Sequence, residues 1–223
     1  MAQQINAPRG MRDFLPVEKA KREHLISAAI AEYVARGFQQ IETPILEDLE
    51  RLQSGQGGDN EKLVFKVQKR GEEFTQALEN GSELADLGLR FDLTVPLTRY
   101  FASNQGKLPR VLKAIQTGPV FRAERPQKGR YRQFYQVGIE AIGLNDPLID
   151  AEVIWLADQA FKNIGLKNYR LEITSLGDAE SRAAHRKDLL KFYETLNLDE
   201  ATASRAKLNP LRLFDDKRPE MVD

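Results

Sequence analysis

Two segments, Ala114-Ile-Gln-Thr-Gly-Pro-Val-Phe-Arg122 and Arg132-Gln-Phe-Tyr-Gln-Val-Gly-Ile-Glu-Ala-Ile142, decide the fold of this chain. Both have the composition of β-strands, and they flank a turn-rich connection, Arg125-Pro-Gln-Lys-Gly-Arg130. Two strand-like runs joined by a connection that contains Gly and Pro are typical of an antiparallel hairpin with an extended loop. The sequence therefore predicts a long hairpin between residues 114 and 142.

Helical patterns lie on both sides of this hairpin in the sequence. Apolar residues recur at helical spacing in residues 17–36, and again in residues 147–164 after the candidate N-cap Asp146. Further helices are expected at 95–102 and 179–196, and short strands at 38–41, 63–67, 87–91 and 169–173. We therefore predict an α+β fold with a mainly antiparallel sheet flanked by helices. A doubly wound sheet is disfavoured, because no glycine-rich strand-to-helix turn of the dinucleotide or P-loop type occurs.

The composition limits the classes of function. The chain has 223 residues, with 33 basic and 33 acidic side chains, so any site for a polyanion must be local. It has no cysteine, which excludes disulfides and thiolate zinc sites and fits a reducing compartment. Neither a secretory signal nor a membrane-spanning segment is recognisable. These features predict a cytoplasmic globular protein with one substantial core or a core with a small appendage.

The second strand of the hairpin has two different faces. Residues 135, 137, 139 and 141 are Tyr, Val, Ile and Ala, a face that suits packing against helices. On the other face, Gln136 and Glu140 bracket Gly138, about 13 Å apart along the strand. This arrangement predicts a trough with a hydrogen-bonding group at each end. The simpler alternative is a solvated sheet face.

A dense basic cluster lies in and around the hairpin loop. It consists of Arg122, Arg125, Lys128, Arg130 and Arg132, with Glu124 as the only acid among them. Arginine forks suit phosphate oxygens, and the neighbouring Phe134 can stack on a base. An ordinary charged loop would have the same composition. The combination with the trough on one continuous element favours a nucleotide site.

Other candidate residues are less specific. Asp92 follows an apolar strand and begins a helix, so it is either a plain N-cap or a carboxylate that grips an ammonium group. His24 and His185 have no carboxylate or cysteine at ligand spacing, so no metal site is predicted. Trp155 lies on the apolar stripe of the 147–164 helix and is expected in the core.

Four stretches resemble the histidyl-tRNA synthetases, a family of class II aminoacyl-tRNA synthetases. Residues 8–16 resemble the opening of these enzymes, and residues 37–44 look like class II motif 1, which in that family helps to form the dimer interface. Leu89-Arg-Phe-Asp-Leu-Thr-Val-Pro96 resembles the family's histidine-binding segment. The run from Phe121 to Gln136 looks like motif 2, the class II hairpin that binds ATP. Motif 2 with the following Val-Gly-Ile-Glu140 is the most specific of these matches.

The resemblance implies roles for individual residues. Arg122 would hold the α-phosphate of ATP together with the reacting carboxylate, and would be the catalytic residue. The ATP-binding residues would be Arg122, Glu124 at the adenine edge, Phe134 stacked on the adenine, and Arg130 at the outer phosphates. The histidine-binding residues would be Asp92, Leu93, Thr94, Arg122, Gln136 and Glu140, with Glu140 facing the imidazole.

The resemblance also implies a reaction and partners. ATP, with Mg²⁺, would activate L-histidine to histidyl-adenylate, and the histidyl group would pass to tRNA(His) on a homodimeric enzyme. Residues 1–223 would form the N-terminal part of a class II catalytic domain. The second histidine-binding segment, motif 3 and the anticodon-binding domain are absent from the sequence, so we expect a fragment. Tyr135 stands where many bacterial members have histidine, and little effect is expected from it because it lies on the apolar face.

Two alternatives compete with this interpretation. The first is a non-catalytic paralogue such as the histidine-sensing regulatory subunit of ATP phosphoribosyltransferase, which shares the fold but tends to lose the phosphate-binding residues of motif 2. The second is an RNA-binding or regulatory module without ligase activity. Retention of Arg122, Glu124, Arg130 and Phe134 weighs against the first, and the zero net charge weighs against the second.

Overall fold

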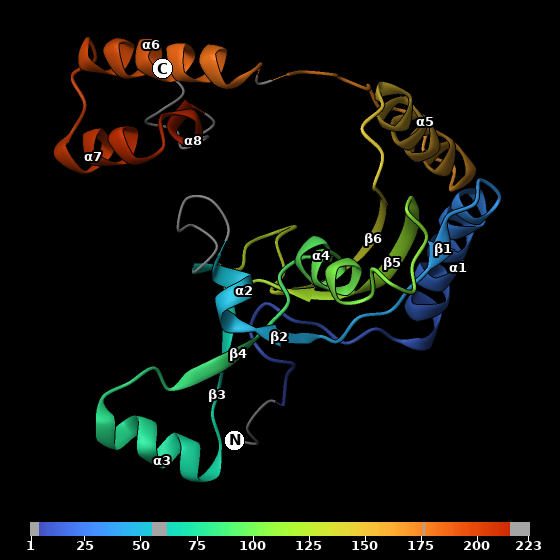
Figure 1. Ribbon diagram of the computed structural model, residues 1–223, viewed down its shortest axis with the longest axis horizontal. Helices are drawn as coiled ribbons and strands as arrows, with labels where there is room; N and C mark the ends of the chain where they lie inside the picture. Colours follow the sequence, from blue (N-terminus) through green and yellow to red (C-terminus); the bar gives the residue numbers. More distant parts are fainter. Residues whose placement is uncertain (1–4, 55–61, 176, 215–223) are drawn as a thin grey trace. The chain divides into compact units, whose positions relative to one another are not determined.

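The computed structural model describes residues 5–54, 62–175 and 177–214, apart from the side chains of residues 212 and 214. The chain divides into two compact units, residues 1–168 and 169–223 (Figure 1). Within these described ranges, no helix is long and apolar enough to cross a bilayer.

The predicted hairpin is the main part of the first sheet. Its strands β5 (Leu112–Phe121) and β6 (Gln133–Ile142) are antiparallel and pair without interruption from Leu112 opposite Ile142 to Phe121 opposite Gln133. The short strand β1 (Gln39–Gln40) joins the other edge of β5 in parallel, which gives the order β1-β5-β6. The hairpin and its extended loop are therefore confirmed.

Two helices pack on one face of this sheet. They are α1 (Pro16–Val34) and α5 (Pro147–Asn163), and each has proline in its first turn. The Asp146 side chain accepts a hydrogen bond from the N–H of Leu148, which confirms it as the N-cap of α5. The core between the helices and the sheet is formed by Tyr33, Phe38, Ile115, Leu156 and Ala160. Ile139 packs against this core, so its side of β6 faces the helices as expected.

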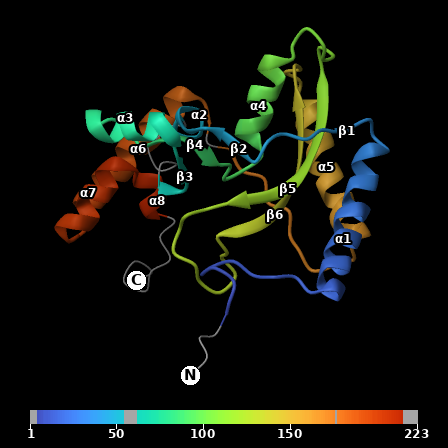
Figure 2. The same cartoon turned by 90° about the horizontal axis from the view of Figure 1, so that it is seen from below.

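Helix α4 (Thr94–Ser103) covers the opposite face of the hairpin (Figure 2). Leu97 of α4 forms a buried cluster with Leu112 and Ala114 of β5. The strand β5 is therefore buried on both faces, which explains why apolar residues dominate it. Because α4 begins above the middle of β5, the residues just before it lie over the predicted trough.

A second sheet adjoins the first within the same unit. It has the order β2-β4-β3, with β2 (Leu46–Asp48), β3 (Phe65–Gln68) and β4 (Ala85–Leu89) all antiparallel to their neighbours. Helix α2 (Leu49–Gln53) follows β2, and α3 (Gly71–Asn80) connects β3 to β4. Arg90, directly after β4, joins the sheets, because its N–H donates to the Ile45 carbonyl and its own carbonyl accepts from the N–H of Phe121.

The second unit is helical where it is described. It contains α6 (Ala179–Glu194), α7 (Glu200–Leu208) and α8 (Pro210–Phe214). Their small core consists of Tyr193, Ala206 and Leu213, and the Tyr193 hydroxyl donates to the Pro210 carbonyl over 2.8 Å. The polar helix predicted at 179–196 is confirmed.

Two sequence-based expectations are wrong. Residues 169–173 form no strand in the part of the chain that the structure describes, and Leu171 and Ile173 are 58% and 75% exposed. Alternation of apolar residues favours an extended backbone, but a strand also needs a hydrogen-bonded neighbour. Trp155 is 42% exposed instead of buried. Its ring contacts the guanidinium group of Arg36 at 4.7 Å, which covers part of its apolar surface.

Candidate active site

The predicted trough lies on the α4 side of the hairpin. The register places Gln136 opposite Gly118, Gly138 opposite Gln116, and Glu140 opposite Ala114, and directly opposed residues share a face. A Cβ atom at Gly138 would meet only one atom beyond its chain neighbours within 4 Å in the described part of the chain, the Cδ1 of Leu93 at 3.9 Å. The glycine thus leaves open space between Gln136 and Glu140, with Leu93 beside it.

One end of the trough is closed by hydrogen bonds. The Thr94 hydroxyl donates to Oε1 of Glu140 over 2.8 Å, which joins residues 46 positions apart in the sequence. Oδ1 of Asp92 accepts from the backbone N–H groups of Thr94 at 2.9 Å and of Val95 at 3.3 Å. Asp92 thus accepts from the first N–H groups of α4, although the residue at the N-cap position itself is Leu93. Both bonds use Oδ1 of Asp92. The other carboxylate oxygen, Oδ2, is therefore not used by these two bonds and could accept from an ammonium group.

Arg122 stands at the other end, directly after β5. Its Nε donates to the Phe91 carbonyl over 3.2 Å, and its guanidinium carbon lies 5.0 Å from the ring centroid of Phe134. Its backbone N–H donates to the Arg132 carbonyl over 2.9 Å, which continues the hairpin ladder by one pair. The side chain is half-buried and is held at its Nε. This orientation suits a guanidinium that binds an anion above the hairpin.

The hairpin loop carries the remaining predicted ATP-binding residues. Nη1 of Arg130 lies 3.5 Å from Oε1 of Glu124, and the Arg130 side chain is 56% exposed. Nε of Arg132 donates to the Glu124 carbonyl over 3.1 Å. The structure thus brings Glu124 and Arg130 together in the loop, whereas Arg122 and Phe134 meet at its base.

A buried polar network that the sequence reasoning missed supports the closed end. Gln116, on β5, accepts a hydrogen bond from the Thr43 hydroxyl at 2.9 Å through Oε1 and donates to the Leu93 carbonyl at 3.0 Å through Nε2. Thr43 and Gln116 are each 5% exposed. Because buried polar groups are costly unless they are paired, these bonds fix the position of residues 92–94 relative to the sheet. An amide in a mainly apolar strand was the signal available in the sequence.

Arg90 is the second residue that sequence reasoning missed. It is only 4% exposed, and burial lowers the pKa of its guanidinium. Its Nε donates to the Pro119 carbonyl over 3.0 Å, and its Nη1 donates to the Thr43 carbonyl over 2.9 Å. A Cβ atom at Gly118 would lie 2.3 Å from Nη2 of Arg90, so the glycine makes room for the arginine. The signal available in the sequence was the charged Arg90 within the otherwise apolar residues 87–91.

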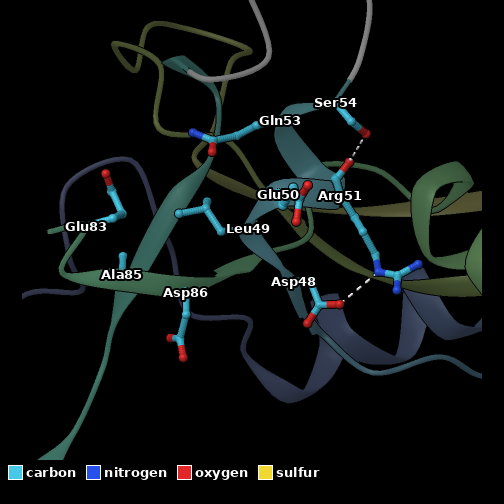
Figure 3. Close-up of a pocket in the computed structure, with 9 residues that line it drawn as sticks. All are labelled: Asp48, Leu49, Glu50, Arg51, Gln53, Ser54, Glu83, Ala85 and Asp86. Atoms are coloured by element: carbon cyan, nitrogen blue, oxygen red, sulfur yellow. Dashed lines mark hydrogen bonds and ion pairs between the residues drawn. The ribbon is translucent and has the colours of Figure 1, made fainter. Parts of the chain in front are cut away.

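A separate pocket lies on the second sheet, away from the trough. Figure 3 shows its lining, which consists of Asp48, Leu49, Glu50, Arg51, Gln53, Ser54, Glu83, Ala85 and Asp86. Arg51 is paired with Asp48 at 2.8 Å, so the other carboxylates dominate the charge of the pocket. Such a lining disfavours a polyphosphate. It contains none of the predicted site residues.

Comparisons with known proteins identify the family to which the sequence is related. A sequence model of the family described as "Histidyl-tRNA synthetase" matches residues 10–209. A histidine–tRNA ligase of Leifsonia xyli subsp. xyli is 51% identical over 178 residues, which cover 78% of this chain and 41% of the relative. A histidine–tRNA ligase of Corynebacterium jeikeium is 43% identical over 222 residues, which cover 98% of this chain and 48% of the relative. The chain thus spans about half the length of the curated relatives it matches.

A solved structure extends the match to three dimensions. The crystal structure of histidyl-tRNA synthetase from Nostoc sp. superposes with a TM-score of 0.64 at 26% identity, and the match covers 98% of this chain and 45% of that one. The mixed α+β architecture predicted from the sequence is thereby confirmed as the class II synthetase type. The family match covers most of the chain and includes all the predicted site residues. The chain therefore belongs to the histidyl-tRNA synthetase family.

Proposed function

We propose that this chain carries part of the active site of a histidine–tRNA ligase, which activates L-histidine with ATP and transfers it to tRNA(His). The observation that carries the proposal is the trough itself. A carboxylate fixed by Thr94, an open glycine floor and an arginine beside an aromatic ring lie on one face of a single hairpin. These are the groups that an imidazole, an amino acid backbone and a nucleotide phosphate require.

Histidine is proposed to occupy the closed end. Glu140 accepts a hydrogen bond from an imidazole N–H, and the 2.8 Å bond from Thr94 restricts its carboxylate to one orientation. Asp92 and Gln136 bind the α-amino group, while Leu93 packs beside the ligand above Gly138. The substrate carboxylate then points along the strand toward Arg122. A site that pairs a buried polar group of its substrate discriminates strongly against analogues that lack the group.

ATP is proposed to occupy the arginine end. Phe134 stacks on the adenine, Glu124 accepts from the adenine amino group, and Arg130 binds the outer phosphates. Arg122 binds the α-phosphate, to which its planar fork is suited. The exposed position of Arg130 and its 3.5 Å separation from Glu124 support this division, because neither group is locked in a short ion pair.

The chemical step is a displacement at phosphorus. A carboxylate oxygen of histidine attacks the α-phosphorus, the bond from that phosphorus to the bridging oxygen of pyrophosphate breaks, and pyrophosphate leaves. Arg122 stabilises the negative charge that develops on the α-phosphoryl oxygens. The protein contributes mainly by positioning and charge neutralisation, which supply most of the rate in such reactions.

Magnesium, tRNA(His) and a second copy of the chain complete the proposal. The described residues contain no group of three or more His, Cys, Asp or Glu side chains that could hold a metal ion. We propose that a magnesium ion enters with ATP, is held mainly by the ATP phosphates and would neutralise their charge. Homodimer formation and a cytoplasmic location remain proposals. The comparisons give the regulatory-subunit alternative no greater support than the ligase.

The test is histidine-dependent ATP–pyrophosphate exchange. The assay uses this chain and, in parallel, the complete product of its gene, with the other amino acids as controls. The proposal predicts exchange with histidine alone in the complete product. Absence of exchange there, combined with tight histidine binding, would favour the regulatory subunit. Tight RNA binding that ATP does not affect would favour an RNA-binding module.

A further inference from the structure

Two arginines and three aromatic rings form a continuous series of contacts between the N-terminal segment, α1 and the hairpin. The guanidinium carbon of Arg12 lies 5.0 Å from the ring centroid of Tyr131 and 4.4 Å from that of Phe14. The guanidinium carbon of Arg22 lies 4.3 Å from the Phe14 centroid and 4.0 Å from the Tyr135 centroid. All four distances are within the range of about 6 Å for a cation–π interaction. We call Tyr131, Arg12, Phe14, Arg22 and Tyr135 the arginine–aromatic series.

Arg22 depends on these rings because its Nε lacks a conventional partner. The Nε atom is buried and has no hydrogen-bond acceptor among the described residues, although a carboxylate oxygen of Glu23 lies 3.8 Å away. The Arg22 side chain as a whole is only 19% exposed. An N–H group without an acceptor is unfavourable in a buried place, and the negative face of an aromatic ring offsets part of that cost. The arrangement therefore holds Arg22 between Phe14 and Tyr135.

The N-terminal segment also contacts the hairpin loop through its backbone. The Arg132 N–H donates to the Gly10 carbonyl over 2.7 Å. Gly10 has a φ of +83°, and a Cβ there would lie 2.9 Å from Cβ of Pro126 and 3.0 Å from Cγ of Arg132. Only glycine combines this backbone conformation with so close an approach. Residues 10–14 are thus attached to the loop at Pro126, Tyr131 and Arg132.

We infer that the arginine–aromatic series holds the hairpin loop, residues 122–132, in position for ATP. The inference rests on the proposed nucleotide role of this loop. The Arg122 backbone N–H donates to the Arg132 carbonyl, so restraint of Arg132 also restrains the backbone of Arg122. A loop that is ordered before binding avoids an entropic cost when the nucleotide binds. Arg12, Phe14, Arg22 and Tyr135 are in this sense positioning residues, because they act through the loop.

Tyr135 acquires a role that its place on the apolar face did not suggest. Tyr135 as a whole residue is 39% exposed, and its ring packs against Arg22 of α1 instead of entering the core. The ring, and not the hydroxyl, faces the cation. A histidine at this position would offer a smaller ring and, when protonated, would repel Arg22. We therefore expect Tyr135 and Arg22 to be functionally coupled.

The experiment compares disruptive and conservative variants of the complete gene product. Arg22→Gln and Tyr135→Leu break the series, while Tyr135→Phe keeps the ring. Arg36→Gln is the matched control, because it removes a cation–π contact of similar length, 4.7 Å to Trp155 of α5, that includes no residue of the hairpin or the N-terminal segment. Amide hydrogen exchange of residues 8–14 and 122–132 reports the position of the loop. The KM values for ATP and histidine in pyrophosphate exchange report its effect on the site.

The two disruptive variants should accelerate amide exchange in both segments by about tenfold, since local opening becomes easier. They should raise the KM for ATP by about three- to tenfold and leave the KM for histidine within about twofold. Tyr135→Phe and Arg36→Gln should behave like the unmodified protein.

Unchanged amide exchange in both disruptive variants would overturn the inference. Faster amide exchange with an unchanged KM for ATP, or an equal rise of the KM values for ATP and histidine, would overturn the positioning role. If the complete gene product without substitutions catalysed no pyrophosphate exchange, the proposed function would fail. The amide exchange would still decide separately whether the series holds the loop.

Discussion

The two ends of the trough differ in how their charged groups are held. At the histidine end, Glu140 accepts a 2.8 Å hydrogen bond from Thr94, whose own position is fixed by the Asp92 cap and the buried Gln116. At the nucleotide end, Arg130 is more than half exposed and lies 3.5 Å from its acidic neighbour. The first end has its geometry before a ligand arrives, whereas at the second end the exposed Arg130 side chain can adjust to a ligand on a loop whose backbone is held. A rigid end suits discrimination between amino acids, and an adjustable end suits the neutralisation of a flexible polyphosphate.

The largest expected effect comes from Arg122→Ala at the nucleotide end. Loss of a group that stabilises transition-state charge should slow adenylate formation by roughly a thousandfold. Arg122→Lys should recover part of the rate, because it restores the charge without the planar fork. Histidine-dependent pyrophosphate exchange measures both, with Arg70→Ala, an exposed arginine before α3, as the control. Near-normal exchange in Arg122→Ala would remove this residue from the chemical step.

Glu140→Gln tests the histidine end. The neutral amide cannot match the carboxylate as an acceptor for the imidazole N–H, so the KM for histidine should rise about thirtyfold while that for ATP changes less than about threefold. Glu79→Gln, on the exposed side of α3, is the control for loss of one negative charge. Equal increases in both KM values would show that the two ends are not specialised as described.

A pair of glycine variants separates the trough from the fold. Gly138→Ala meets only Leu93 Cδ1 at 3.9 Å, so it should leave stability unchanged but lower histidine affinity about tenfold, because the methyl group occupies ligand space. Gly118→Ala would place a Cβ 2.3 Å from Nη2 of Arg90, which is buried and hydrogen-bonded and cannot easily move. It should cost about 1–3 kcal/mol of unfolding free energy. Thermal unfolding and histidine titration of both variants measure the contrast, and similar profiles for the two would contradict it.

The smallest expected effect comes from Thr94→Val. This change removes the hydrogen bond to Glu140 but keeps the carboxylate, so the KM for histidine should rise about three- to fivefold with no change for ATP. Thr98→Val is the matched control, since its hydroxyl donates to the Val95 carbonyl within the same helix and faces no proposed ligand. A rise as large in Thr98→Val would indicate a general loss of α4 stability.

The hairpin and the division of its faces could be predicted from the sequence because both depend on local patterns. Alternation along residues 132–142 and the turn residues of the loop are sufficient to specify them. The support of the histidine end could not be predicted in this way. Gln116 is bonded to Thr43, 73 residues away, and Arg90 is bonded to carbonyls of two other segments. The sequence shows the polar residue in each case but not its partner.

The errors have the same origin. The alternating residues 169–173 were predicted as a strand, but the described part of the chain supplies no neighbour for them. Trp155 fits the apolar stripe of α5, yet the stripe is wider than the surface that α1 and the sheet cover. The family resemblance named Thr94 and Glu140 as histidine-binding residues, but neither it nor any pattern in the residues predicted the hydrogen bond between them. Long-range contacts decide such questions, and local periodicity does not contain them.

The most direct test of the central claim is a titration with a non-hydrolysable histidyl-adenylate analogue and its alanyl counterpart. Such a molecule spans both ends of the trough at once. The account predicts that the histidyl analogue binds about a hundredfold more tightly, and that Glu140→Gln removes this preference and leaves the affinity for the alanyl analogue unchanged. Equal affinity for the two analogues, or a preference that survives in Glu140→Gln, would contradict the assignment of the trough as the histidine and ATP site.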